Sequence, residues 1–152
     1  MFLNINCSIE KKNNLESQKR ILYHYEMDSL VYQRNYSLVI KERIDYTIYE
    51  YVYSSDSTKN MIFRFDKKKD EIQSGPLKFE NELLKNLFIE ELSKKSFKSY
   101  ADKTGSSHPN NSEWFNREYG ILNFGYQVNE FYFLPEIENE KITTEIIAKL
   151  RK

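Results

Sequence analysis

The residues best suited to recognition lie between positions 113 and 119, directly after a polar loop. The only tryptophan of the chain, Trp114, is followed here by Arg117 and Glu118. Trp, Tyr and Arg dominate the energetically important positions of binding surfaces. We therefore take Trp114, Arg117 and Glu118 as candidate binding residues, together with His108 from the preceding loop.

Two other interpretations of this segment remain open. Trp114 could instead anchor the loop onto the core, with solvated charges around it, and the burial of Trp114 distinguishes these two roles. A small enzyme with a loop-built site near residues 102–118 is a further alternative. Its side chains would be His108, Glu113 and Arg117.

No motif in the chain predicts catalysis or metal binding. The two histidines, His24 and His108, lack the H-x-x-x-H and H-E-x-x-H spacings of metal sites. The P-loop, the G-x-S-x-G motif and the dinucleotide-binding fingerprint are also missing. The single cysteine, Cys7, excludes an internal disulfide and a cysteine-based zinc site. We therefore expect no catalytic residues, no metal and no cofactor.

Composition limits the classes of partner. The chain has 152 residues, a formal net charge of zero, 39% hydrophobic residues and 30% charged residues. That length and composition suit one folded domain. A neutral chain exerts no long-range attraction on nucleic acid, so we expect no nucleic-acid partner. No stretch reaches the roughly 18 apolar residues of a membrane span.

Period-two alternation of apolar residues predicts strands along much of the chain. Residues 44–53 give the clearest pattern, because Tyr49, Tyr51 and Tyr53 share one face. A helix over residues 14–32 competes with the strand interpretation of that region. The predicted strands are 3–9, 21–27, 32–40, 44–53, 61–66, 70–73, 119–125 and 131–134.

Two segments show helical spacing instead. Leu83, Leu84, Leu87, Phe88 and Leu92 recur at intervals of three and four, which predicts a helix near 79–96. A second helix is predicted near 141–151. The sequence therefore predicts a single α+β domain spanning residues 1–152. Its antiparallel β-meander of about six to eight strands would carry both helices packed on it.

By elimination, the sequence favours a non-catalytic binding or interaction protein with a protein partner, such as a specific inhibitor or an immunity-type protein. The alternative is a cell-envelope lipoprotein or periplasmic domain, in which Cys7 would be a lipidation site if the start codon is mis-assigned. As written, the chain carries no signal peptide, and we expect a cytoplasmic protein.

Overall fold

The computed structural model describes residues 16–102 and 113–151. These residues form ten strands, one α-helix and one turn of 3₁₀ helix, η1. The elements are β1 (Gln18–Glu26), β2 (Ser29–Glu42), β3 (Tyr46–Val52), η1 (Ser57–Lys59), β4 (Met61–Asp66), β5 (Glu71–Ser74), β6 (Leu77–Leu87), β7 (Phe97–Asp102), β8 (Glu113–Asn116), β9 (Gly120–Tyr126), β10 (Asn129–Leu134) and α1 (Glu140–Leu150).

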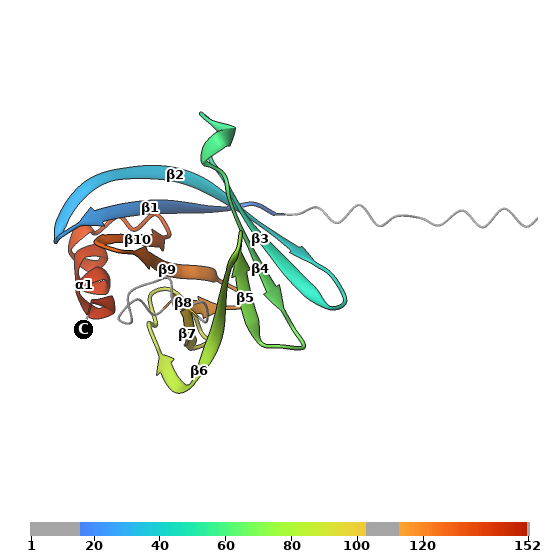
Figure 1. Ribbon diagram of the computed structural model, residues 1–152. Coiled ribbons are helices and arrows are strands. Elements are labelled where there is room, and N and C mark those ends of the chain that lie inside the picture. Colours follow the sequence, from blue (N-terminus) through green and yellow to red (C-terminus); the bar gives the residue numbers. More distant parts are fainter. Residues whose placement is uncertain (1–15, 103–112, 152) are drawn as a thin grey trace, which may run out of the picture.

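The sheet closes into a barrel (Figure 1). Each strand pairs antiparallel with its neighbour in sequence, and β1 also pairs with β10. The predicted antiparallel meander of an α+β fold is confirmed, with more strands than expected. The additional strands are β6, β7 and β8, whereas the predicted strand at 3–9 lies outside the described residues.

The predicted helix near 79–96 is wrong, because its first half is strand β6. A bulge interrupts the pairing of β6 with β7 between Asn81 and Asn86. The side chains of Leu83 and Leu84 are 80% and 97% exposed, and Leu84 has a φ of +78°. Leu83 and Leu84 therefore lie in a bulge that exposes both side chains to solvent, although their spacing in the sequence resembles that of a helix. The alternative helix over 14–32 is also wrong, since β1 and β2 occupy its described part.

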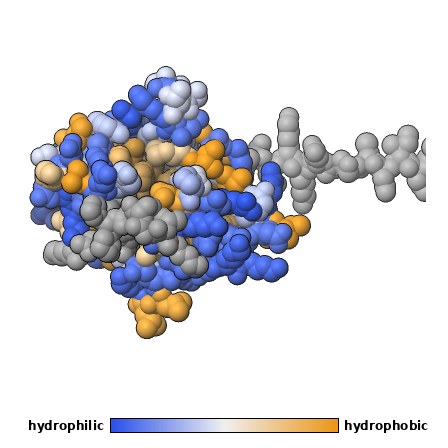
Figure 2. Space-filling view, in the orientation of Figure 1, coloured by the Kyte–Doolittle hydropathy of each residue, from blue (hydrophilic) through white to orange (hydrophobic). Residues whose placement is uncertain are grey.

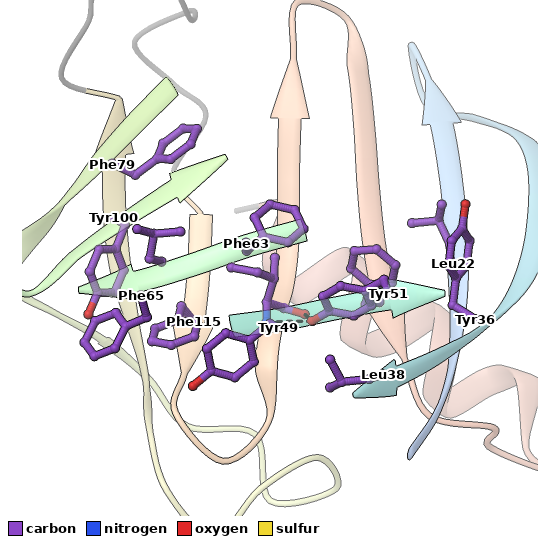
Figure 3. Close-up of a cluster of buried hydrophobic side chains, with 13 residues drawn as sticks. Leu22, Tyr36, Leu38, Tyr49, Tyr51, Phe63, Phe65, Phe79, Tyr100 and Phe115 are labelled. Carbon is purple, nitrogen blue, oxygen red and sulfur yellow. Dashed lines mark hydrogen bonds between the residues drawn. The ribbon is translucent and has the colours of Figure 1, made fainter. Parts of the chain in front are cut away.

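Aromatic side chains fill the interior of the barrel (Figure 3). Alternation sends every second residue inward, so β3 buries Tyr49 and Tyr51 completely. The ring of Tyr51 stacks on Phe133 of β10 at 4.0 Å between ring centres. The cluster consists of Leu22, Tyr36, Leu38, Tyr49, Tyr51, Phe63, Phe65, Ile72, Phe79, Tyr100, Phe115, Ile121 and Phe133.

Helix α1 confirms the prediction near 141–151 and covers part of the outer wall beside β1 and β10 (Figure 1). It begins after Asn139, whose side-chain oxygen accepts a hydrogen bond from the Lys141 backbone N–H. Its buried Ile146 and Ile147 pack in a second apolar cluster with Leu122, Tyr132, Leu134 and other residues of the outer wall.

The barrel has two ends. The η1 end carries η1, the β1–β2 turn, the β5–β6 turn and the β9–β10 turn. The Gly120 end carries the β2–β3, β4–β5 and β8–β9 turns and the segment between β6 and β7. In Figure 1, η1 stands at the top and the β2–β3 turn lies at the right. Residues separated along one strand therefore reach different ends of the molecule.

Candidate binding surface

The predicted binding residues do not converge on one site. Trp114 is half-buried against the outer cluster under α1, and its backbone N–H donates to the Asn123 side chain at 2.8 Å. That placement favours the anchoring role. Arg117 and Glu118 are exposed in the β8–β9 turn. His108 lies outside the described residues.

Strand β8 also separates Glu113 from Arg117, two of the residues that the predicted enzyme site requires. Glu113 begins β8 at the η1 end, whereas Arg117 follows β8 at the Gly120 end. Arg117 lines a separate cavity of about 200 Å³ with Asp70, Lys98 and Tyr100. The two residues therefore do not share a site. Cys7, which the lipoprotein alternative requires, lies outside the described residues, so that alternative remains a prediction.

A cluster of exposed apolar side chains gathers at the η1 end instead. Half of the ten large hydrophobic residues that are exposed in the described chain lie on the adjacent β1–β2 and β9–β10 hairpins. The Met27 backbone N–H donates to the carbonyl oxygen of Val128 at 3.5 Å and joins the two tips. We call this set the double-hairpin patch: Met27, Leu30, Val31, Tyr126 and Val128.

The patch is hydrophobic where a surface loop is usually polar. Met27 is 74% exposed and Tyr126 is 51% exposed. Figure 2 shows hydrophobic atoms among polar ones at the left of the molecule, where the β1–β2 hairpin lies. Contiguous exposed apolar surface with a polar rim marks interaction sites on soluble proteins.

Both hairpin tips contain residues other than glycine whose backbone adopts the left-handed conformation, with positive φ. The φ angles are +45° for Met27, +72° for Asp28 and +56° for Gln127. Glycine, asparagine and aspartate are preferred at such positions, and the conformation costs other residues, here Met27 and Gln127, about 1–2 kcal/mol each. Strain of this kind clusters at functional sites, which supports a role for the apolar Met27 beyond folding.

An aromatic stack supports the patch from inside the barrel. The His24 ring lies 4.5 Å from Phe131 and 4.7 Å from Tyr32, and Phe131 stacks on Phe124 at 4.6 Å. His24 Nε2 is 2.7 Å from Asn129 Oδ1. These contacts connect β1, β2, β9 and β10 directly below the turns, so the two tips rest on a rigid base.

The rim of the patch is acidic. Residues 26–31 and 126–130, which contain both tips, include Glu26, Asp28 and Glu130 but no Lys or Arg. Arg151, just after α1, forms ion pairs with Asp28 at 3.0 Å and with Glu130 at 2.5 Å. One guanidinium thus pairs with two of the three carboxylates, which leaves the border of the apolar centre with a net negative charge.

Glu113 is a second unusual group at this end. It is the first residue of β8, it pairs with Tyr100 of β7, and it is 3% exposed. Burial raises the pKa of its carboxyl group well above the ordinary value, and the nearby Asp102 raises it further. Glu113 Oε2 has no hydrogen-bond partner among the described residues. The raised pKa favours the protonated form, in which the carboxyl group is a neutral hydrogen-bond donor.

Sequence reasoning missed most of these residues. The alternation Glu113, Phe115 was the available signal for an inward-facing glutamate on β8, but the strand has only four residues. Apolar residues beside the turns at Met27 and Val128 were the signal for the patch. Their proximity arises from barrel closure, which no local pattern shows.

Comparison of the chain with family models, with curated proteins and with solved structures found no match. Within residues 16–102 and 113–151, no helix is long and apolar enough to cross a membrane. The same residues contain no group of three His, Cys, Asp or Glu side chains placed to hold a metal ion.

Proposed function

We propose that this chain is a non-catalytic protein-binding protein, of the inhibitor or immunity class, that contacts its partner through the double-hairpin patch. The observation that carries the proposal is the gathering of five exposed apolar side chains on two hydrogen-bonded hairpin tips. The other exposed apolar residues are distributed over β4, β6 and the connections after β2 and β6.

The chemistry of the patch defines the partner. Met and Tyr are enriched in the centres of protein interfaces, and a charged rim steers association. An apolar centre bordered by Glu26, Asp28 and Glu130 fits a partner protein with an apolar contact surface and a basic border. Because the tips are held by the aromatic stack, little conformational entropy is lost on binding.

The test places a photo-crosslinking amino acid at one exposed position at a time in the full chain and irradiates it in cells of the source organism. We expect position 126, within the patch, to capture one protein, and position 44 to capture none. Ile44 is the matched control because it is 94% exposed and lies at the Gly120 end.

Binding of the captured protein is then measured with purified components. Val128→Lys adds a positive charge to the patch and is expected to weaken binding at least tenfold, whereas Ile44→Lys leaves it unchanged. An affinity that Val128→Lys does not alter, or crosslinking from position 44 as strong as from position 126, would rule out the patch as the interface.

A further inference from the structure

Arg20 is a buried cation without a buried counter-ion. It is 6% exposed, and its guanidinium carbon lies 4.2 Å from the centre of the Tyr119 ring. Its Nη groups donate to the carbonyl oxygens of Lys19 and Tyr119 and to the side-chain oxygen of Gln18. Nε is buried without an acceptor, and none of the described carboxylates forms an ion pair with this group.

This arrangement is energetically unusual. Buried charges in proteins are normally neutralised by a partner, because neutral acceptors do not replace the hydration lost on burial. The three acceptors of Arg20 are neutral, and two of its five N–H groups, Nε–H and one on Nη1, have no acceptor among the described residues. The guanidinium therefore retains both charge and hydrogen-bonding capacity that an oxyanion could satisfy.

A cavity of about 300 Å³ opens beside Arg20 at the Gly120 end. Ser93 and Lys94 contribute polar groups to its wall. Ser93 Oγ already accepts hydrogen bonds from Asn116 Nδ2 and the Lys95 backbone N–H, so its own hydroxyl proton is available to donate. Leu92, Pro135 and the Tyr119 side chain supply an apolar wall.

The negative charge in this wall is compensated. Glu118 also lines the cavity, but it is paired with Lys95. Arg20 and Lys94 therefore leave the site with a net positive charge. A smaller cavity of about 170 Å³ also touches Arg20, and there Lys19 is paired with Glu136 at 3.8 Å.

We propose that the 300 Å³ cavity is a binding site for a small organic monocarboxylate. The carboxylate is bound by Arg20, Ser93 and Lys94, and the apolar body of the ligand packs against Leu92 and Pro135. The site lies at the opposite end of the barrel from the double-hairpin patch, so it is independent of the proposed protein interface.

The probe is sodium benzoate, titrated into the ¹⁵N-labelled full chain at constant ionic strength. We expect saturable shifts of the Arg20 Nε–H signal and of the backbone amides of Ser93 and Lys94 in ¹H–¹⁵N spectra. Benzamide, which has the same shape without the charge, and inorganic phosphate, which lacks the apolar body, are expected to bind at least tenfold more weakly.

Lys94→Glu tests the site without disturbing the fold, because Lys94 is exposed. It is expected to weaken benzoate binding about tenfold or more, since a charged hydrogen-bonding group is replaced by a repulsive one. Arg64→Gln is the matched control: the Arg64 guanidinium lies 4.1 Å from the Tyr46 ring centre but is exposed and away from the cavity.

The proposal is overturned if benzoate shifts none of the three signals, or if Lys94→Glu and Arg64→Gln change its affinity equally. Equal affinities for benzamide and benzoate would also overturn it, because the carboxylate would then play no part. Preferential binding of phosphate would refute the assignment of an organic monocarboxylate.

Discussion

Glu113 shows how one buried group links pH to stability. Because burial raises the pKa of its carboxyl group in the folded protein above the ordinary value near 4.5, the folded state keeps a proton that the unfolded state releases. The stability contribution of Glu113 is therefore fully present below about pH 4.5 and is lost as pH rises toward the folded-state pKa.

The corresponding variant is Glu113→Gln, which keeps the shape and removes the titration. We expect the free energy of unfolding of the wild-type protein to fall, relative to the variant, by up to ~1.4 kcal/mol per pH unit above pH 4.5. Urea unfolding of both proteins between pH 5 and 8 measures this difference. Parallel pH profiles would show that Glu113 titrates normally.

Gly120 lies where the packing leaves no room for a Cβ atom. Its φ is +92°, and a Cβ there would lie 2.7 Å from the Tyr51 hydroxyl oxygen. That hydroxyl group accepts from the Ile121 N–H at 2.8 Å and donates to the Ile121 carbonyl oxygen at 3.1 Å. A side chain at position 120 would therefore strain the backbone and displace a buried hydrogen-bonding group.

We expect Gly120→Ala to lower the free energy of unfolding by about 2–4 kcal/mol, from backbone strain and overpacking together. Gly75→Ala is the matched control, because Gly75 has a φ of +55° and a Cβ there would meet no atom within 4 Å. It should cost about 1 kcal/mol from strain alone. Equal losses in chemical denaturation would contradict a steric role for Tyr51.

At the scale of elements, regular alternation made several strands predictable. In β3, the predicted shared face of Tyr49 and Tyr51 matches the structure, in which both residues are buried and the residues between them are only partly buried. The hairpin of β9 and β10 and helix α1 were also predicted from their patterns. Strand β3 and helix α1 each bury one face, which the sequence records directly, whereas β9 and β10 bury consecutive residues on both faces at one end of each strand.

Elements that depend on distant partners were not predictable in this way. Leu83, Leu84 and Leu87 have helical spacing in the sequence, but Leu83 and Leu84 lie in the bulge of β6 and point into solvent. Strand β8 is too short to show a period. Of the candidate site residues, Trp114 is half-buried, which favours the anchoring role without deciding between the two predicted roles. The adjacency of the two hairpin tips requires the pairing of β1 with β10.

The β1–β2 turn carries a prediction of its own. Met27→Gly removes a side chain from a left-handed position, and we expect the free energy of unfolding to rise by about 0.5–1 kcal/mol. The same change removes an apolar side chain from the patch, so binding of the partner should weaken. Thermal unfolding and titration with the partner measure the two effects, and a loss of stability would contradict the inferred strain in this turn.

At the scale of the whole molecule, the aromatic content explains how a ten-stranded barrel is filled. The interior of a barrel widens as strands are added, and wide barrels enclose ligand cavities. Here the chain supplies 12 Tyr and 10 Phe, and rings from opposite walls meet in the centre, as Tyr49 of β3 and Phe115 of β8 do at 5.2 Å between ring centres. Binding is therefore expected at the ends of the barrel.

Phe133→Ala tests whether this interior is filled. Phe133 is 0% exposed and contacts Tyr36, Tyr51 and Phe124. Its truncation should lower the free energy of unfolding by about 3–5 kcal/mol and leave an apolar cavity.

Such cavities remain dry and bind small apolar molecules, so benzene should raise the melting temperature of the variant but not that of the wild-type protein. Phe133→Leu, which fills most of the space, should respond less. Equal stabilisation of wild type and Phe133→Ala by benzene would show that the barrel already contains an open cavity, and the interior would then be a ligand site in its own right.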